Sequence, residues 1–305
     1  METYLCLDAG GSKYVVGLIR RDGTLVAKRG GKWDGLTEEG ILRTLVTESH
    51  ALMAETGERP DAIGVTIPGL ADAERGLWVE ASFSGIRDFA ICARLQQELG
   101  IPAYCENDGQ AYALAEMLFG CCQDAKDFLF MNISNGIGGA IVTGGQLVRG
   151  HTGCAGEFGH CCVVPDGRPC KCGLSGCLEM HAAGPGIARN YQELGGGEAD
   201  CRLIAQRARE GEKTALRVFA LEGEYLSRVL GAAVNLLNPQ RIVIGGGVSL
   251  AFDLFEKPLR AALEKTVYAG ANPQVDICAT PLGYDAGLYS AAAIAVTQRE
   301  HLCGY

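Results

Sequence analysis

The sequence has no uninterrupted apolar run of about 18 residues, the length with which a helix can cross a bilayer, so we expect no membrane span. Its first residues show neither the basic start nor the long apolar core of a secretion signal. Positive charge is also scarce, because 27 Lys and Arg stand against 36 Asp and Glu, for a net charge of −9. Such a surface repels phosphate backbones. These absences predict a cytoplasmic protein that binds neither membranes nor nucleic acid.

The sequence also lacks the GxxxxGKS/T motif, so we expect no P-loop nucleotide-binding fold. Its 48% hydrophobic and 21% charged residues are typical of a globular protein. The 305 residues are enough for two domains of about 150 residues each. Glycine is abundant, with 43 residues, and many of these fall between strand patterns, where they indicate sharp turns.

The 14 cysteines could suggest a disulfide framework, but such frameworks are typical of short secreted chains. Most of these cysteines, for example Cys6, Cys92 and Cys105, lie in apolar runs. We therefore interpret them as small buried side chains in a reducing compartment. The cysteines between positions 161 and 177 follow a different pattern.

Strand patterns recur in the same order in both halves of the sequence. A strand pattern at 3–9 precedes a glycine turn, a second strand, the hairpin signal Asp22-Gly23 and a third strand. The succession returns at 128–134, followed by the glycine turn NGIGG and two further strands. This repetition predicts two similar α/β halves, each with a glycine turn that could contact one polyphosphate. Helix patterns occur at 37–56, 200–237 and 284–297.

Residues 159–179 combine ligand types that zinc prefers with spacing that lets them converge. Zinc favours four tetrahedral nitrogen and sulfur ligands in closed structural sites. Glycines among the cysteines let the backbone fold back on itself. We expect Cys161 and Cys162 to be strand core, although they could replace the histidine as ligands, and the thiols could also be buried without a metal. The predicted structural zinc ligands are His160, Cys170, Cys172 and Cys177.

Three glycine-rich turns follow strand patterns and suit phosphate binding, because glycine lets backbone N–H groups approach an anion. Asp8 precedes the first turn and could hold Mg²⁺ or its water shell. A tight hairpin without a ligand is the alternative for this turn. The candidate nucleotide-binding residues of these turns are Gly10, Gly11, Ser12 and Lys13 in the first, Asn135, Gly136, Gly138 and Gly139 in the second, and Gly245, Gly246 and Gly247 in the third.

Glu106-Asn107-Asp108 follows an apolar stretch that ends a strand pattern and precedes a helix. Carboxylates at this position face the ligand in α/β folds. Asp108 could therefore accept the proton of a substrate hydroxyl during phosphoryl transfer. Alternatively, Asp108 could cap a helix that begins at Gly109.

Taken together, these motifs resemble the ROK family of sugar kinases, within the superfamily of actin-like, hexokinase-like ATPases. The resemblance spans nearly the whole chain in the expected order, and the join between GEFGH and CKCGLSGCLE is its most specific part. The matching stretches are Asp8–Lys13, Ile67–Gly69, Glu106–Asp108, Gly136–Gly139, Gly156–His160, the cysteine segment through Glu179, Gly245–Gly247 and Asp285–Gly287.

The resemblance implies two actin-like, ribonuclease H-like α/β domains that flank a catalytic cleft. The first would span 1–109, with the C-terminal helix at about 286–305 packed back on it. The second would span 110–285 and contain the zinc-binding segment 157–179. The family also implies ATP, Mg²⁺ and structural Zn²⁺ as cofactors and a homodimer as the assembly.

The resemblance also implies a role for each matched side chain. Asp108 would be the catalytic base in the phosphorylation of a hexose hydroxyl, with C6 of glucose as the default. His160 would bind zinc through one ring nitrogen and the sugar through the other. The implied sugar-binding residues are Gly69, Asn107, Glu157, His160 and Glu179.

Departures from the family pattern leave the sugar open. Ser12 and Asn135 stand where threonine is usual, and segment 81–88 lacks the family's sugar-binding asparagine. Other substrates are therefore N-acetylmannosamine, N-acetylglucosamine, allose or fructose. A catalytically silent sugar-binding protein is a further alternative. A ROK-like transcription factor is not expected, because Asp8 leaves no room for a preceding DNA-binding segment.

Overall fold

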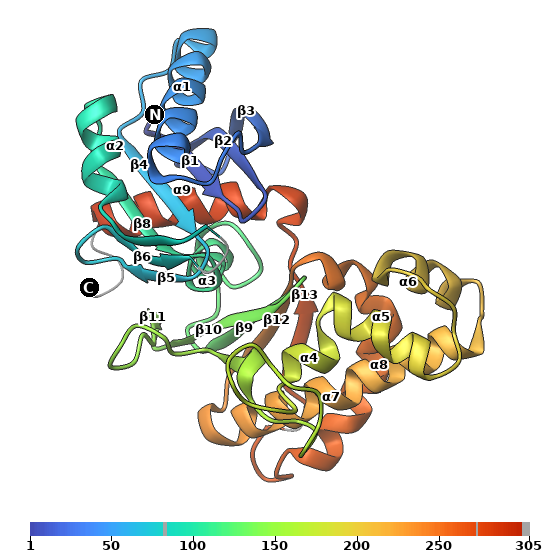
Figure 1. The fold of residues 1–305 in the computed structure, drawn as a ribbon. Helices are drawn as coiled ribbons and strands as arrows, with labels where there is room; N and C mark the ends of the chain where they lie inside the picture. The colour runs from blue at the N-terminus through green and yellow to red at the C-terminus, as the bar shows by residue number, and fades with distance from the viewer. Residues whose placement is uncertain (82–83, 273, 301–305) are drawn as a thin grey trace. The chain divides into compact units, whose positions relative to one another are not determined.

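The computed structural model describes residues 1–81, 84–272 and 274–300. The chain divides into two compact units (Figure 1). Unit 1 consists of Met1–Asp124, Gly145–Cys154 and the C-terminal segment from Pro281. Unit 2 consists of Ala125–Gly144 and Ala155–Thr280. Helix α3 (Asp108–Leu118) therefore belongs to unit 1, whereas the sequence-based division at residue 109 assigned it to the second domain.

Unit 1 is built on a mixed five-stranded sheet in the order β3-β2-β1-β4-β8. The strands β1 and β2 pair antiparallel, as do β2 and β3, whereas β1, β4 and β8 are parallel. A small antiparallel sheet, β5-β6-β7, adjoins it in sequence. The strands are β1 (Thr3–Ala9), β2 (Lys13–Arg20), β3 (Leu25–Lys32), β4 (Ala62–Ile67), β5 (Leu70–Asp72), β6 (Leu77–Ala81), β7 (Ile86–Phe89) and β8 (Ala103–Asn107).

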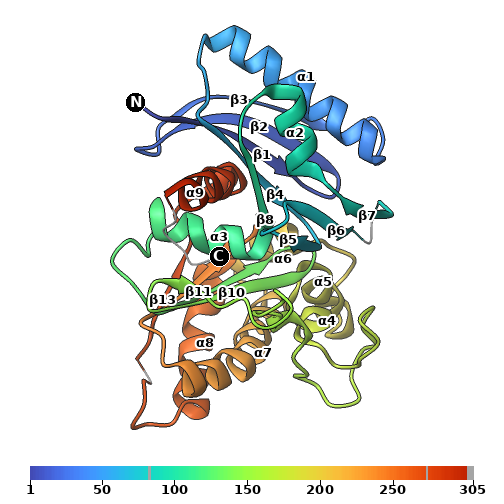
Figure 2. The same cartoon turned by 90° about the vertical axis from the view of Figure 1, so that its left-hand side faces the viewer.

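Helices cover both faces of this sheet, as Figure 2 shows. Helices α1 (Glu38–Thr56) and α2 (Ile91–Leu99) pack on one face, where Leu5 and Leu7 of β1 point. Helix α9 (Ala286–Glu300) packs on the other face against Tyr4 and Cys6. Because side chains alternate along a strand, the continuous apolar run of β1 fills two cores at once. Residues 301–305, which we assigned to the last helix, lie outside the described residues.

Unit 2 repeats this sheet, with the order β11-β10-β9-β12-β13. Here β9 and β10 pair antiparallel, whereas β9, β12 and β13 are parallel. The predicted repetition of the α/β halves is therefore confirmed at the level of strand order. The strands are β9 (Phe128–Ile133), β10 (Ile137–Thr143), β11 (Gln146–Leu147, whose residues belong to unit 1), β12 (Arg241–Gly245) and β13 (Asp276–Ala279).

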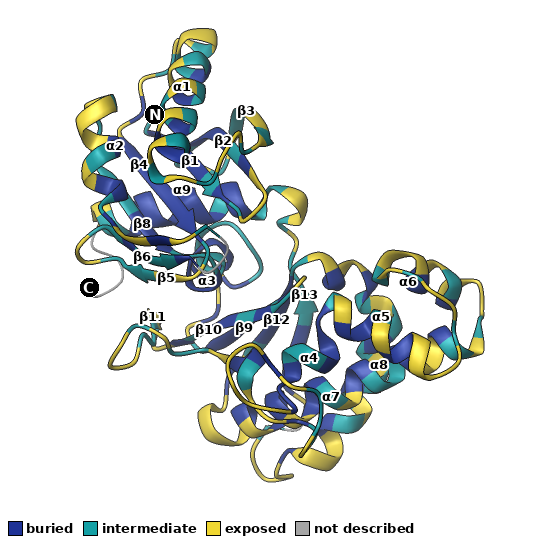
Figure 3. Ribbon diagram, viewed as in Figure 1, coloured by how far each residue is buried: buried dark blue, intermediate teal, exposed yellow. Residues whose placement is uncertain are grey.

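Helices of unit 2 form its large apolar core with one face of β9, where Leu129, Met131 and Ile133 point. Figure 3 shows the buried inner sides of these elements and their exposed outer sides. No helix of the described residues is long and apolar enough to cross a membrane. The helices are α4 (Leu178–Ala182), α5 (Gly184–Glu193), α6 (Cys201–Arg209), α7 (Lys213–Leu237) and α8 (Phe252–Thr266), with short 3-10 turns η1 (Phe158–His160) and η2 (Gly247–Ala251).

Candidate functional site

The carboxyl ends of the parallel strands in unit 1 bring polar side chains into one row. Asp8 of β1 pairs with Thr66 of β4, which in turn pairs with Glu106 of β8. The Thr66 hydroxyl donates to Asp8 Oδ1 over 2.9 Å. Burial raises the pKa of Asp8, while this hydrogen bond and the charge of Lys13 act in the opposite direction. The row can therefore hold a cation at its edge, where a carboxylate is already partly desolvated.

Helix α9 approaches Asp8 closely at Gly287. A Cβ atom at this position would lie 2.2 Å from Asp8 Oδ2. Gly287 lies in the first turn of α9, where other residues could adopt the backbone conformation. The glycine is therefore required by the proximity of the carboxylate and not by the backbone angle.

The first glycine turn joins β1 to β2 through only Gly10, Gly11 and Ser12. The indole Nε1 of Trp33 donates to the Gly10 carbonyl over 2.8 Å and fixes the start of the turn. Gly11, Ser12 and Lys13 are exposed. The turn is thus a tight β-hairpin, and its exposed donors are available to an anion.

Asn107, and not Asp108, is the N-cap of helix α3. Its Oδ1 accepts from the backbone N–H of Gly109 over 2.9 Å, and its Nδ2 donates to the Gly69 carbonyl over 2.8 Å. Asp108 is the first helical residue, and its Oδ1 accepts from the Gly109 N–H over 2.8 Å. The alternative in which Asp108 caps a helix that begins at Gly109 is therefore wrong, because Asn107 already performs that function.

The charges of Asp8 and Asp108 both act on the phenol of Tyr112, which is only partly exposed. Burial raises the pKa of Tyr112, and the negative charges of Asp8 and Asp108 raise it further. Among the predicted residues of unit 1, Gly69 and Asn107 are in direct contact, and Asp8 and Asp108 both influence Tyr112. Unit 1 therefore gathers its predicted residues at one edge of its sheet.

The second glycine motif contains a shorter turn than we expected. Only Ser134, Asn135 and Gly136 connect β9 to β10, so Gly138 and Gly139 lie inside a strand. Gly139 is tightly packed there, since a Cβ on it would lie 2.5 Å from the Phe130 carbonyl oxygen and 2.6 Å from the ring of Phe158, whereas a Cβ on Gly138 would meet nothing within 4 Å. The turn assignment for 135–139 was thus wrong at its end, because sequence alone does not distinguish a turn glycine from a packing glycine.

The motif GEFGH contains the 3-10 turn η1, which packs against β10 of unit 2. A Cβ on Gly159 would lie 2.2 Å from the Ile137 carbonyl oxygen, so η1 rests directly on the strand backbone. Glu179, at the start of α4, reaches the same strand, where its Oε2 accepts from the Ile137 N–H over 3.0 Å. Glu179, one of the predicted sugar ligands, is therefore hydrogen-bonded to the residue that follows the second glycine turn.

The four predicted metal ligands converge, since their donor atoms all lie within 4.8 Å of one another. Cys172 Sγ lies 3.6 Å from Cys177 Sγ, and Cys170 Sγ lies 3.8 Å from His160 Nδ1. Tetrahedral zinc with Zn–S bonds of about 2.3 Å holds its sulfur ligands roughly 3.8 Å apart. The donor set thus fits zinc in type, number and spacing.

The two ring nitrogens of His160 face different partners. Nδ1 faces the cysteine cluster, whereas Nε2 lies 3.9 Å from Glu157 Oε2. A metal on Nδ1 would make Nε2 a hydrogen-bond donor. Burial raises the pKa of Cys177 to about 12, so a bound cation would be needed to hold this thiol as a thiolate at neutral pH.

Cys161 and Cys162 are exposed, so our assignment of both to a strand core was wrong. The segment contains no regular strand, and Cys162 forms only an isolated antiparallel bridge with Cys177. Without a strand there is no alternation that would bury them, and it is Val163 and, in part, Val164 that pack against the core of unit 2. The buried positions of Cys6, Cys92 and Cys105 are as we predicted.

The third glycine motif follows β12, as expected. Gly246 has a φ of 82° and lies beside β9, because a Cβ there would be 2.3 Å from the Ile133 carbonyl oxygen. Gly247 is exposed and begins η2. Ser82 and Phe83, within the segment 81–88 that departs from the family pattern, lie outside the described residues.

Sequence reasoning missed two contributors in unit 1. Thr66 supports Asp8, and Arg149 forms an ion pair with Glu106. Thr66 lies in an otherwise apolar strand, which was a usable signal. Arg149 carried no such signal, because its partner is 43 positions away in the sequence.

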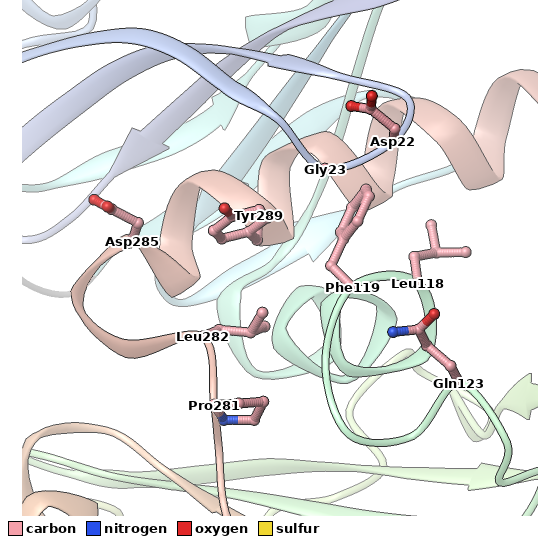
Figure 4. Close-up of a pocket in the computed structure, with 9 residues that line it drawn as sticks. All are labelled: Asp22, Gly23, Leu118, Phe119, Gln123, Pro281, Leu282, Asp285 and Tyr289. Atoms are coloured by element: carbon pink, nitrogen blue, oxygen red, sulfur yellow. The ribbon is translucent and has the colours of Figure 1, made fainter.

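A cavity of about 430 Å³ lies elsewhere in unit 1 (Figure 4). It includes the hairpin turn at Asp22-Gly23, at the end of β2 opposite to the Gly10–Ser12 turn. Asp285 on its wall is bound to Lys28 over 2.5 Å. None of the predicted site residues lines this cavity. Its lining residues are Asp22, Gly23, Leu118, Phe119, Gln123, Pro281, Leu282, Asp285 and Tyr289.

Comparison with known proteins agrees with the fold and these motifs. Residues 4–298 match the ROK family. The chain is 32% identical over 321 residues to a glucokinase from Halalkalibacterium halodurans, with 98% of this chain and 96% of that protein covered. It is 33% identical over 300 residues to an N-acetylmannosamine kinase from Shigella boydii, with 96% and 98% covered.

A solved structure extends the comparison. The ROK family glucokinase from Streptomyces griseus, in complex with glucose and AMPPNP, matches with a TM-score of 0.83 and 28% identity over 97% of this chain and 99% of that chain. The molecule is therefore an α/β protein with mixed sheets of the kind found in ROK sugar kinases. The chain belongs to the ROK family, which confirms the resemblance seen in its motifs.

Proposed function

We propose that this chain is an ATP-dependent kinase that phosphorylates a hexose hydroxyl, with C6 of glucose as the first candidate. The observation that carries this function is the similarity to glucokinases along nearly the full length of both chains. The ATP analogue and glucose in the Streptomyces griseus structure agree with it. The chain is an enzyme of the sugar-kinase class.

In this proposal Asp108 is the general base that accepts the proton of the attacking sugar hydroxyl. The cap role of Asn107 supports it, because the helix does not need the Asp108 carboxylate as its cap. Its position at the carboxyl end of β8 is one from which side chains reach ligands in α/β folds. A base positioned in this way contributes about a hundredfold or more to the rate.

Glu157, His160 and Glu179 are the proposed ligands of the sugar hydroxyls in unit 2, and Gly69 and Asn107 are those in unit 1. The 3.9 Å approach of His160 Nε2 to Glu157 supports a shared ligand. The hydrogen bond from Ile137 holds Glu179 beside the second glycine turn. A sugar bound here would meet one donor and two carboxylates, which suits adjacent hydroxyl groups.

The three glycine motifs are the proposed contacts of the ATP phosphates and nucleoside. Exposed donors at Gly11, Ser12 and Lys13 support this for the first motif. Asp8 would hold Mg²⁺, which neutralises charge on the transferring phosphoryl group when it is bound. Asn135 is exposed and can still donate through its amide where threonine is usual.

Zinc on His160, Cys170, Cys172 and Cys177 would be structural, because four protein ligands leave no open position. The proposed role of this site is to fix the His160 ring and the start of α4, which carries Glu179. Close to one zinc per chain is expected from metal analysis of the purified protein. A folded, active preparation without zinc would contradict the site.

The finer fold assignment, two actin-like domains that flank a catalytic cleft, is part of this proposal, as are a homodimer and a cytoplasmic location. The free state of every cysteine in the described part of the chain supports a reducing compartment. The net charge of −9 supports the absence of nucleic-acid binding. Sedimentation analysis and a DNA-binding assay at low salt would test the assembly and the charge argument.

N-acetylmannosamine is the second candidate substrate, favoured by the 33% identity to the Shigella boydii kinase. A panel of glucose, N-acetylmannosamine, N-acetylglucosamine, allose and fructose, with coupled detection of ADP, separates the candidates. We expect kcat/KM to be highest for glucose. A higher kcat/KM for N-acetylmannosamine would make that sugar the assigned substrate. If none of the sugars led to formation of ADP, the kinase proposal would be refuted.

A further inference from the structure

One segment of the chain leaves unit 2 and returns to it after a short excursion. Gly145–Cys154 belongs to unit 1, whereas the residues on both sides of it belong to unit 2. The segment begins with β11 and ends just before the motif that contains Glu157 and His160. Leu147 packs against apolar residues of α3 and α9, and polar contacts join the segment to the corner between β8 and α3.

Arg149 is the centre of these contacts. Its Nη1 makes a short hydrogen bond to Glu106 Oε2 and donates over 2.9 Å to Gln110 Oε1. Gln110 in turn donates through Nε2 to the Gly153 carbonyl over 2.6 Å. Glu106 and Gln110 are both buried, with 2% and 4% of their surface exposed. The segment is thus fastened to the corner at two points.

The residues that Arg149 holds flank Asp108 on both sides. Glu106 stands two positions before it at the end of β8, and Gln110 stands two positions after it in the first turn of α3. Glu106 Oε1 also accepts from the Asn107 N–H over 3.0 Å, so the carboxylate fixes the N-cap residue itself. The geometry of the strand-to-helix corner therefore depends on where Glu106 and Gln110 are held.

Charge makes this dependence strong. Burial raises the pKa of Glu106, and the Arg149 guanidinium opposes that effect. A buried carboxylate whose cation is removed must take up a proton, move towards water or remain uncompensated. Each outcome alters the hydrogen bond from Asn107 and so displaces the N-terminal turn of α3. Both hydrogen bonds leave from one nitrogen, Nη1, so the ammonium group of a lysine could supply the charge and part of this pairing.

We infer that Arg149 is a positioning residue for Asp108, acting through Glu106 and Gln110 and not through contact with a substrate. This inference rests on the proposed role of Asp108 as the base. Displacement of a catalytic group by about 1 Å can cost roughly a hundredfold in rate.

The test compares Arg149→Met, Arg149→Lys, Glu106→Gln and the double variant Arg149→Met/Glu106→Gln in the full-length protein. We expect Arg149→Met to lower kcat by roughly tenfold to a hundredfold, with the KM values for ATP and sugar changed less than about threefold. Arg149→Lys should recover part of the loss. The double variant should be no worse than Arg149→Met, because the neutral amide that replaces the Glu106 carboxylate would leave no buried charge unpaired.

Arg241→Met is the matched control. Arg241 also pairs with a carboxylate on the neighbouring strand, Asp276, and its side chain is 21% exposed against 22% for Arg149. It lies at the start of β12, at the opposite end from the third glycine motif. We expect the Arg241→Met variant to retain wild-type kcat. The side chain of its partner Asp276 is 52% exposed, so the melting temperature of this variant measures the loss of an arginine of equal exposure from a pair with an exposed acid.

Three results would overturn the inference. The first is a wild-type kcat in a folded Arg149→Met variant. The second is a raised KM for ATP at unchanged kcat, which would indicate direct contact of Arg149 with the phosphates. The third is a double variant whose fold-loss in kcat equals the product of the losses in the two single variants. If Arg149→Met does not fold, Arg149→Lys and Glu106→Gln decide by the same criteria, because both preserve side-chain volume.

Hydrogen exchange separates this inference from the proposed function. Amides of residues 107–110 should exchange faster in Arg149→Met than in wild type, whether or not the enzyme is active, whereas Arg241→Met should leave them unchanged. Unchanged exchange at 107–110 would refute the positioning role alone. An Asp108→Asn variant with near-normal turnover would refute the base and leave the exchange result intact.

Discussion

The two five-stranded sheets have the same strand order but differ in what stands at their carboxyl ends. In unit 1 acids stand at the strand ends, with Asp8 near the end of β1, Glu106 near the end of β8 and Asp108 directly after β8. In unit 2 the corresponding ends carry glycines, at Gly136 after β9 and at Gly246 after β12. Acids suit cations and proton transfer, whereas glycines expose backbone N–H groups to anions. One scaffold thus provides two kinds of chemistry.

Two buried glutamates extend the comparison. Glu106 of unit 1 is held by Arg149, whereas neither carboxylate oxygen of Glu222, on α7 of unit 2, has a hydrogen-bond partner among the described residues. Burial raises the pKa of both carboxyl groups, and that of Glu222 lies well above its ordinary value. Unit 1 therefore keeps its buried acid paired next to the site, and unit 2 tolerates an unpaired one within its helical layer.

The largest expected effect follows from the removal of Asp108, the acid that stands directly after β8 in unit 1. Asp108→Asn should lower kcat by at least about a hundredfold, since the amide cannot accept the proton of the sugar hydroxyl. Zinc content and melting temperature should stay close to wild type. Asp127→Asn changes a partly exposed carboxylate just before β9, which accepts from the Thr143 hydroxyl at the end of β10; it is the control and should keep full turnover. Near-normal turnover of Asp108→Asn would refute the base assignment.

The next effect concerns the contact between α9 and the first acid. Gly287→Ala would place a methyl group 2.2 Å from Asp8 Oδ2, so the carboxylate must move. We expect turnover to fall by roughly tenfold and the Mg²⁺ concentration needed for half-maximal rate to rise. This loss should occur even though alanine has a higher helix propensity than glycine. Steady-state kinetics over a Mg²⁺ series provide the measurement. Gly197→Ala, which meets nothing within 4 Å, is the control, and equal behaviour of the two variants would argue against a cation at Asp8.

Unit 2 can be tested through its metal ligands. Cys172→Ser should lower zinc content and raise the KM for sugar by roughly tenfold, because the fixed His160 ring is lost. Affinity for AMPPNP, measured by calorimetry, should change little. Cys162→Ser is the matched control, since this exposed thiol lies outside the four-ligand cluster, and it should keep its zinc. An equal loss of sugar and nucleotide affinity would show that the zinc site supports the whole unit.

The smallest effect concerns Glu222 and depends on pH. Because the folded pKa of Glu222 is raised, this group contributes fully to the free energy of unfolding below the ordinary carboxyl pKa of about 4.3. That contribution is lost as pH rises from there through the raised folded pKa. Glu222→Gln removes this titration, so its melting temperature relative to wild type should increase from pH 4.5 to pH 8. Glu224→Gln, exposed on the same helix, should show no such trend. A constant difference for Glu222→Gln would contradict the unpaired buried acid.

Much of the fold follows from local patterns. The helix at 37–56 was predicted within one residue of the observed Glu38–Thr56, because apolar periodicity and a capping Thr37 coincide there. The repeated succession of strands predicted the two similar sheets. The assignment of α3 to unit 1 did not follow, because it depends on packing of Ala111 and Leu114 against α9, far away in the sequence.

The candidate site divides in the same way. The spacing of the residues alone predicted the four metal ligands, and the fold brings their donor atoms together. This prediction was possible because the three cysteines lie within one short loop. The extent of the second glycine turn and the exposure of Cys161 and Cys162 were predicted wrongly. Both errors concern which neighbour a residue meets, and a local pattern does not contain that information.

By itself, the sequence determined the family, the order of the strands and the types of residue at their ends, because these are properties of local chemistry and short-range spacing. Only the tertiary structure decided that Asn107 caps α3, that Gly287 must leave room for Asp8 and that Arg149 holds Glu106. The physical reason is that a buried charge or a close backbone approach is defined by its partner. In this chain Arg149 and Glu106 are 43 positions apart, and Asp8 and Gly287 come from the first strand and the last helix.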